Sequence, residues 1–386
     1  MWNLIYIERQ ISDKFEKISK AYPVVALVGA RQAGKTTFLK KHLHGAAYVL
    51  FDDPDARELF EEDIKKFETQ YVKQLTVLDE VHYCKDAGRK LKYLADKGNR
   101  LWITSSSELI LKKEVLSYLV GRVSILRLYP FSLQEFLKAK QWRSLNEKIL
   151  KRAVWEHMVY GGYPKAVLTE DTELKETILK DLYETMILKD IARTFSIDDI
   201  DSLEKFTRYL AINTSSIITY NKIADVINIS HQTIKKYLDA MEKSHLLVRV
   251  QPFYSNKNKE ITKQPKVYFL DTGLRNAVVN SFRTEAEGML FENYVLTELI
   301  KNGWEVKFWR NKSKAEVDFI VEVKGEIIPV EVKLSSTKIS RSLQAFIKMY
   351  SPKRCFVVNY EGKKRTVGYE DTKIEFLDIK TLLDRV

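Results

Sequence analysis

This 386-residue chain has few cysteines, no histidine metal motif and no long apolar run, and each of these features excludes a class of protein or site. It has only two cysteines, Cys84 and Cys355, which lie far apart in the sequence; this spacing excludes a zinc finger or ribbon and fits a reducing compartment. Its six histidines form no HExxH motif. The chain has no uninterrupted apolar run of about eighteen residues and no pattern of a secretory signal at its start. We therefore expect a cytoplasmic protein without a membrane span.

The most informative stretch is a phosphate-binding loop near the start of the chain. An apolar run at 24–28 is followed by eight residues that match G-x-x-x-x-G-K-[ST] at every fixed position, with Thr37 directly after them: Gly29, Ala30, Arg31, Gln32, Ala33, Gly34, Lys35 and Thr36. Glycines let the backbone curl so that its N–H groups face an anion. Lys35 is placed to reach the β- and γ-phosphates, and Thr36 to bind Mg²⁺. The sequence therefore predicts ATP and Mg²⁺ as cofactors.

A second strand-like run, at 75–80, ends in two carboxylates, Asp79 and Glu80. In phosphate-loop ATPases the first acid holds Mg²⁺ and the second orients and polarises the attacking water. A strand capped by surface acids is the alternative. Because the pair follows the phosphate loop at the end of a strand, we favour the ATPase interpretation, with strands and helices alternating in a parallel α/β sheet.

Two further positions are candidates for contact with the γ-phosphate. The strand expected at 100–104 would lie between the two motif strands, with Ser106, or Ser105, sensing the phosphate; these serines also suit the N-cap of a following helix. Arg122 follows a glycine and could stabilise charge on the phosphoryl group, from the same chain or from a neighbouring subunit of a homo-oligomer. A surface salt bridge is the alternative for Arg122.

The rest of the chain is expected to form three further domains after an ATPase core at 1–140. Residues 141–200 have helical periodicity and form a helical lid, in which Gly161-Gly162-Tyr163-Pro164 is a sharp turn. Residues 201–280 resemble a winged helix-turn-helix, with a helix at 231–243 capped by Ser230 and a basic wing at 255–264. His231, Gln232, Lys235 and Lys236 are exposed where a recognition helix meets a major groove. The net charge of +12 also favours a polyanion, so we predict DNA as partner, with a protein partner as the alternative.

The last domain, at 281–386, has a second group of charged residues. Glu292 lies on an expected helix at 288–301, and Asp318 on a strand at 316–321. Glu331 and Lys333 are two residues apart on the next strand, so they share one face. Carboxylates on adjacent strands beside a lysine can bind Mg²⁺ and activate water, as in the nuclease pattern D-x(n)-[DE]-x-K. A charged strand face in a hairpin is the alternative, and cleavage remains open.

Several motifs together resemble one family. They are GARQAGKTT, VLDEVHY, LVGR with LYPFSLQEF, GGYP, KVYFLDTGL, GMLFENYVLTEL, and AEVDFIV with IPVEVK. The chain is similar to archaeal and bacterial AAA-type (AAA_14) ATPases that carry a C-terminal DUF4143 domain. The resemblance implies an AAA+/ASCE-type P-loop fold followed by a winged helix and a restriction-endonuclease-like PD-(D/E)XK domain. The family's site residues carry over to Lys35, Thr36, Asp79, Glu80, Glu292, Asp318, Glu331 and Lys333.

The sequence departs from this family next to the γ-phosphate site. His82 stands where the family usually has glutamine, and Thr104-Ser105-Ser106 where it often has TGS. We expect an ATPase that binds DNA and controls a Mg²⁺-dependent nuclease-like domain. A nucleotide-gated switch or scaffold that binds DNA or a protein without cutting is the alternative. A kinase-like phosphotransferase fits less well, because no acceptor pocket is evident.

Overall fold

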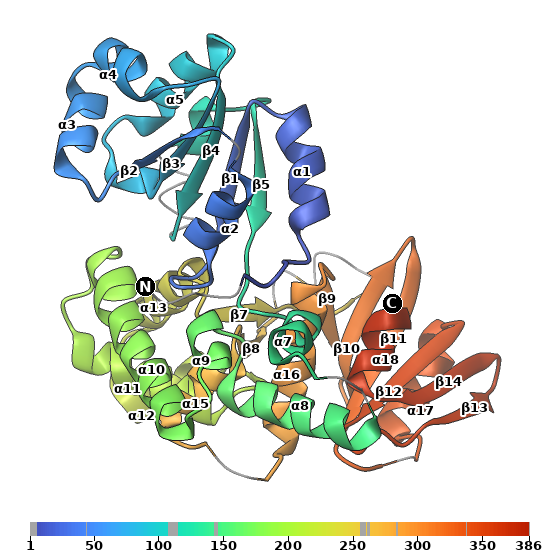
Figure 1. Cartoon of the computed structure of the whole chain (residues 1–386). Helices are drawn as coiled ribbons and strands as arrows, with labels where there is room; N and C mark the ends of the chain where they lie inside the picture. Colours follow the sequence, from blue (N-terminus) through green and yellow to red (C-terminus); the bar gives the residue numbers. More distant parts are fainter. Residues whose placement is uncertain are drawn as a thin grey trace. The chain divides into compact units, whose positions relative to one another are not determined.

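A computed structural model describes residues 6–43, 45–106, 115–142, 146–254, 260, 263–282, 285–336 and 338–385. By their contacts, residues up to Phe131 form one compact unit, and residues from Ser132 onward, apart from 243–245, form a second. Figure 1 shows the chain coloured along the sequence. None of the helices in these ranges is both long enough and apolar enough to cross a membrane.

The first unit contains a five-stranded parallel sheet in the order β2-β3-β4-β1-β5 (Figure 1). The strands are β1 Val24–Val28, β2 Ala47–Leu50, β3 Leu75–Asp79, β4 Arg100–Ser105 and β5 Val123–Arg127. Strand β4 lies between β1 and β3, as the sequence predicted. The carboxyl ends of β1 and β3 therefore flank the end of β4 at one edge of the sheet.

Helices cover both faces of this sheet because β1 is apolar at every position and presents alternate residues to each side. Val25 and Leu27 pack with α1 Ser12–Ala21 and α2 Lys35–His42. Val24, Ala26 and Val28 pack with α3 Pro54–Glu62, α4 Ile64–Tyr71 and α5 Ala87–Asp96. The sheet edge is thus fixed by two cores, which holds the ends of β1 and β3 in place.

The second unit begins with helices α7 Leu133–Lys140, α8 Glu147–Tyr160, α9 Pro164–Leu168 and α10 Thr172–Thr185, followed by a π-helix, η4 Met186–Arg193. The helices within 141–200, which the sequence predicts as a helical lid, group with the second unit by their contacts. The reason is that α8 and α10 pack against α15 Thr272–Val279, a later helix of the same unit.

The Gly161-Gly162-Tyr163-Pro164 turn is a packing site for α15. Gly162 N donates to Asp271 Oδ2 at 2.8 Å, and Asp271 also caps α15. A Cβ at Gly161 would lie 2.0 Å from Asp271 Oδ1, and one at Gly273 would lie 2.2 Å from the Tyr160 carbonyl carbon. Glycines are needed here because the start of α15 approaches the turn too closely for a side chain.

Three helices and a small antiparallel sheet follow. They are α11 Ile200–Ile212, β6 Ser216–Ile217, α12 Tyr220–Ile227, α13 His231–Lys243, β7 Leu247–Val250 and β8 Lys266–Phe269. The sheet order is β6-β8-β7. The predicted bounds of α13 are confirmed, and Ser230 Oγ accepts from Thr233 N at 3.1 Å, as a cap does. Most of the predicted wing, 255–264, lies outside the described residues.

The C-terminal part is built on a six-stranded mixed sheet in the order β13-β14-β12-β11-β10-β9. The elements are α16 Gly288–Lys301, β9 Val306–Arg310, β10 Glu316–Val323, β11 Glu326–Lys333, α17 Arg341–Tyr350, β12 Arg354–Asn359, β13 Arg365–Tyr369, β14 Thr372–Leu377 and α18 Ile379–Arg385. Helices α16 and α18 pack on one face and α17 on the other. Residues Val330 and Val332 of β11 lie in the α16 core.

Two buried polar residues of α16 fasten other elements to it. Glu298, with no exposed surface, accepts from Leu133 N at 2.7 Å and from Lys301 Nζ at 3.1 Å. Burial raises the pKa of Glu298 above its ordinary value. Asn293 accepts from Phe269 N at 3.0 Å and donates to Phe269 O at 2.7 Å, as a neighbouring strand would. The start of α7 and the end of β8 are therefore both fixed to α16.

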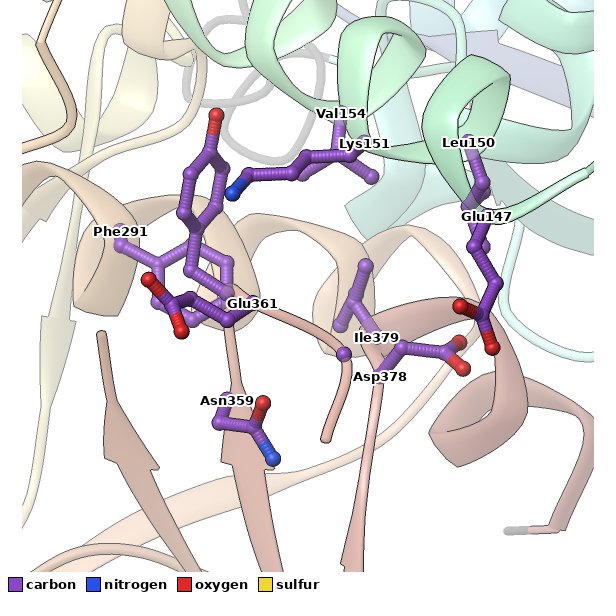
Figure 2. A pocket seen from close by; sticks show the side chains of 11 residues that line it. Glu147, Leu150, Lys151, Val154, Phe291, Asn359, Glu361, Asp378 and Ile379 are labelled. Carbon is purple, nitrogen blue, oxygen red and sulfur yellow. The ribbon is translucent and has the colours of Figure 1, made fainter. Parts of the chain in front are cut away.

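A small cavity of about 40 Å³ lies where α8 meets the ends of β12 and β14 (Figure 2). Lys151 of α8, Phe291 of α16, Asn359 of β12 and Asp378 are among the residues that line it. A space of this size holds water rather than a nucleotide. The cavity is therefore not a nucleotide site, and the sequence motifs mark the candidate site instead.

Candidate functional site

The phosphate loop joins β1 to α2 in the strand–loop–helix arrangement that the motif requires. Gly34 has φ 99° at the N-cap of α2, a left-handed conformation that favours glycine. A Cβ at Gly29 would lie 2.1 Å from the Leu128 carbonyl oxygen. The two glycines of the motif are therefore required by the backbone path itself.

Lys35 points into the curl of this loop. Its side chain is buried, and Nζ donates to the carbonyl oxygens of Gly29 at 2.9 Å and Ala30 at 3.1 Å. In contrast, Gln32, Thr36 and Thr37 are exposed. The phosphate loop thus encloses the charge of Lys35, while the other three side chains remain accessible to solvent.

Asp79, at the end of β3, joins three hydroxyl groups. Thr36 Oγ1 donates to Asp79 Oδ2 at 2.8 Å, the Tyr48 hydroxyl donates to the same oxygen, and Thr104 Oγ1 donates to Asp79 Oδ1. Burial, together with the hydrogen bond to Asp79, raises the pKa of Tyr48 far above its ordinary value, so Tyr48 stays a donor. The structure therefore brings together Thr36 and Asp79, the two residues predicted to bind Mg²⁺.

Glu80 follows directly and has a left-handed backbone with φ 59°. Its backbone N donates to Thr104 Oγ1 at 2.8 Å, Ser106 N donates to Glu80 Oε2 at 3.1 Å, and His82 Nδ1 lies 3.1 Å from that oxygen. Burial alone would raise the pKa of Glu80, but the His82 hydrogen bond and the charge of Lys35 lower it to about 2. Glu80 is therefore an oriented, ionised carboxylate.

The side chain that contacts both Asp79 and the Glu80 backbone belongs to Thr104. That Ser106, or Ser105, senses the γ-phosphate stays a prediction. The register pairs Leu78 of β3 with Ile103 of β4, which places Thr104 beside Asp79. Thr104 is fully buried. Ser106 reaches Glu80 through its backbone N–H, so its contribution does not depend on the serine side chain.

The structure does not bring Arg122 to the phosphate loop. Val123, which begins β5, pairs with Val24, which begins β1, so Arg122 lies at the amino edge of the parallel sheet. The loop leaves the opposite edge. Arg122 Nε instead donates to Asp96 Oδ1 at 2.6 Å, in a pair with both partners well exposed. This pair is the surface salt bridge that was considered as the alternative. It argues against a contact between Arg122 and the phosphoryl group within the same chain.

The sequence interpretation missed two residues at this site, Tyr48 and Arg9. Arg9 is buried, its Nη1 donates to Ala33 O of the phosphate loop at 3.0 Å, and its Nη2 donates to Tyr129 O. Its guanidinium also lies 4.9 Å from the ring centroid of Phe131. Arg9 therefore supports the loop from behind. No motif marks it, because it precedes the first strand by a whole helix.

The second group of charged residues, in the C-terminal part, contains a lysine that the sequence interpretation did not include. Lys266, at the start of β8, has 3% of its surface exposed. Its Nζ lies 2.6 Å from Glu316 Oε1 and 3.2 Å from Glu292 Oε1. Burial alone would lower the pKa of Lys266, but the charges of Glu292 and Glu316 raise it. Lys266 is therefore a buried ammonium among carboxylates.

Asp318 faces the same cluster because β10 is irregular there. The pairing with β9 shifts by one residue between Val317 and Ile320, and such a bulge re-aims a side chain. Asp318 Oδ2 accepts from Val332 N at 2.8 Å and lies 3.9 Å from Lys333 Nζ. Burial, and then the charge of Glu292, raise the pKa of Asp318 to about 7.

Glu331 and Lys333 form a pair on one face of β11, as their spacing predicted. Lys333 Nζ lies 3.0 Å from Glu331 Oε1, and Ser340 Oγ donates to Glu331 Oε2 at 3.0 Å. The metal set predicted from the sequence was Glu292, Asp318 and Glu331. In the described part of the chain no group of three or more acids, histidines or cysteines is arranged to hold a metal ion. The arrangement does not fit Mg²⁺, because Lys266 and Tyr268 already contact Glu292, and Lys266 also contacts Glu316.

The comparison with known proteins also separates an N-terminal domain from the later parts of the chain. Residues 21–137 match the model of an AAA domain (AAA_14), 151–285 match a domain of unknown function (DUF8612), and 287–381 match another (DUF4143). An uncharacterized protein of Haemophilus influenzae is 26% identical, covering 86% of this chain and 82% of the relative. An uncharacterized protein of Methanocaldococcus jannaschii is also 26% identical, covering 92% and 84%. The chain therefore carries an AAA domain and a DUF4143 domain, as the resemblance implied.

Solved structures with similarity to this chain include P-loop ATPases. A Walker-type ATPase of Pyrococcus abyssi is 15% identical, covers 71% of this chain and 96% of its own, and has a TM-score of 0.48. The ORC2 protein of Aeropyrum pernix, in its ADP form, is 12% identical, with coverage of 64% and 88% and a TM-score of 0.33. Because both TM-scores are below 0.5, the chemistry of the site is argued from its own geometry.

Proposed function

We propose that the first unit hydrolyses ATP with Mg²⁺, and that the second unit binds duplex DNA without cutting it. The observation that carries the first half is the hydrogen bond between Thr36 and Asp79. It connects the phosphate loop after β1 with the acidic end of β3. A chance match to the loop motif in an ordinary turn would not produce this connection to a buried acid followed by an oriented carboxylate.

Each residue has a chemical task in this proposal. Lys35 transfers its hydrogen bonds from the loop carbonyls to the β- and γ-phosphate oxygens of ATP. Thr36 and Asp79 offer the oxygen donors that Mg²⁺ prefers, and the bound ion would neutralise charge on the phosphates. Glu80 orients and polarises water. With a pKa of about 2 it is a weak base, so orientation contributes more than proton abstraction.

The test is Mg²⁺-dependent ATP hydrolysis by the full chain. We expect Lys35→Ala to lose nucleotide binding, and Glu80→Gln to bind Mg-ATP normally while its kcat falls by about 100-fold or more. Arg122→Ala is the control, because this residue lies at the opposite edge of the sheet. Near-normal hydrolysis by Glu80→Gln would refute the assignment. An equal loss in Arg122→Ala would restore a role for that arginine through a neighbouring subunit.

The DNA half of the proposal is supported by α13 and its surroundings. Helices α11, α12 and α13 with the β6-β8-β7 sheet have the element order expected of a winged helix. His231, Gln232, Lys235 and Lys236 are exposed in the N-terminal half of α13, where a recognition helix contacts base edges. The net charge of +12 adds a favourable long-range field for a polyanion.

The DNA test uses fluorescence anisotropy with a labelled duplex at several salt concentrations. Lys235→Glu should weaken binding about tenfold and reduce the salt slope by about one. Lys17→Glu makes the same charge change on α1, at an equally exposed position, and serves as the control. If both variants weaken binding equally, net charge is responsible and α13 is not the contact. If neither does, α13 is not the contact, and if the unmodified protein does not bind the duplex at all, the DNA half is wrong.

We propose that the second unit does not cut DNA, because a lysine is already paired with its carboxylates. The order α16, β9, β10, β11, α17 and β12 supports the nuclease-like fold expected for 281–386. However, Lys266, which is not part of the nuclease pattern, is paired with both Glu292 and Glu316. We therefore expect supercoiled plasmid to stay intact with Mg²⁺ or Mn²⁺, with and without ATP. Nicking that disappears in Asp318→Asn would overturn this part and favour the nuclease.

A further inference from the structure

We infer that Lys266 is the resident cation of the C-terminal carboxylate cluster, and that its ammonium group keeps divalent metal ions out. The cluster consists of Glu292 on α16 and Glu316 and Asp318 on β10. The sequence pattern indicated a metal here, and the arrangement of the side chains does not fit one. The inference does not depend on ATP hydrolysis, because it concerns only residues of the second unit.

The geometry assigns the central position to nitrogen. Lys266 Nζ lies 2.6 Å from a Glu316 oxygen and 3.2 Å from a Glu292 oxygen, which are distances of charge-assisted hydrogen bonds. The Tyr268 hydroxyl donates to the same Glu292 oxygen at 2.7 Å. Glu292 and Glu316 are thus already occupied by donors from β8.

Electrostatics explains why a metal would not simply join the lysine. Asp318 is held by Val332 N, with the Lys333 ammonium 3.9 Å away. A divalent ion entering between these groups would lie close to two ammonium groups, which would repel it. It would have to displace Lys266 first.

Lys266 is not free to move aside. Its strand, β8, is paired on both sides, with β6 and with β7. Its ammonium also lies 5.5 Å from the ring centroid of Phe308 of β9. A lysine fixed by its backbone on both sides loses little further entropy in this pair, so it competes well against a metal ion from solution.

The test measures Mn²⁺ binding by electron paramagnetic resonance in the nucleotide-free full chain. The parent protein carries Asp79→Asn, which silences the ATP site. We expect the parent to show no Mn²⁺ binding that depends on Asp318. Lys266→Met, which keeps the length of the side chain but removes its charge, should bind one Mn²⁺ at least about tenfold more tightly than the parent. Adding Asp318→Asn should abolish that gain.

Lys175→Met is the matched control. Lys175 is also a buried lysine of the second unit, and among the residues that the structure describes one carboxylate, Glu156, is paired with it at 2.7 Å. This variant should bind Mn²⁺ as the parent does. If Lys266→Met does not fold, Lys266→Gln is measured in its place. The Mn²⁺ binding of the parent protein tests the inference in either case. Mn²⁺ binding by the parent that disappears with Asp318→Asn would overturn the inference, as would no gain in either Lys266 variant.

Discussion

Thr104 provides the sharpest test of the ATP site, because its single hydroxyl serves both catalytic acids. Thr104→Val removes this hydroxyl at nearly constant volume. The Glu80 N–H, which donates to Thr104 Oγ1 at 2.8 Å, would then lose its acceptor, and Asp79 Oδ1 would lose a donor. A hydrogen bond to a charged group contributes about 1.5–3 kcal/mol, and an unsatisfied buried amide costs about 1–3 kcal/mol.

The combined loss is about 2.5–6 kcal/mol, a large part of the stability of a single unit. We therefore expect the melting transition of the first unit to fall by roughly 10 °C in Thr104→Val, measured by scanning calorimetry without nucleotide. We also expect kcat for ATP to fall at least about tenfold, because Glu80 is no longer held. Thr104→Ser keeps the hydroxyl and should recover most of both quantities.

Ser106→Ala is the decisive comparison. Ser106 holds Glu80 through its backbone N–H, so removing its hydroxyl should change kcat less than about twofold. If Ser106→Ala is as damaging as Thr104→Val, the original choice of Ser106 was correct. If Thr104→Val melts and hydrolyses ATP like the parent, the assignment of the bridging hydroxyl is refuted.

Three further outcomes follow from the structure. His82→Ala should lower kcat several-fold by releasing Glu80, and His82→Gln should recover much of the loss; equal activity in all three proteins would remove this role. The pKa of Asp318 is raised from 3.8 to about 7, so the folded state binds more protons in this window and its stability falls as pH rises. Asp318→Asn should therefore exceed the parent in urea stability at pH 8, on the order of a few kcal/mol, and match it near pH 4. Gly161→Ala should cost about 2–5 kcal/mol in urea unfolding by displacing Asp271, and a loss under 1 kcal/mol would contradict the contact.

Short-range patterns predicted the parts of the ATP site that follow one strand. The phosphate loop and the Asp79-Glu80 pair each lie at the end of an apolar run, and parallel strands bring such ends to one edge. Which hydroxyl of β4 reaches Asp79 depends on the register between β3 and β4, which no local pattern contains. Thr104 was therefore missed in favour of Ser106.

Arg122 could have been placed correctly from the sequence. It precedes its strand, and residues before a parallel strand lie at the amino edge, away from the ligand. Lys266 could not have been placed. A lysine at the start of an apolar strand resembles a solvent-facing strand end, and its partners on α16 and β10 lie far along the chain. Only the packing of β8 against α16 shows that the lysine is buried.

The Arg9 guanidinium has a consequence for the phosphate loop of the first unit. Its Nη1 donates to Ala33 O of the loop, and its Nη2 donates to Tyr129 O after β5. One side chain therefore connects the loop to a segment that is far away in the sequence. A shift of the loop backbone on nucleotide binding would either be matched at Tyr129 or break one of these two hydrogen bonds.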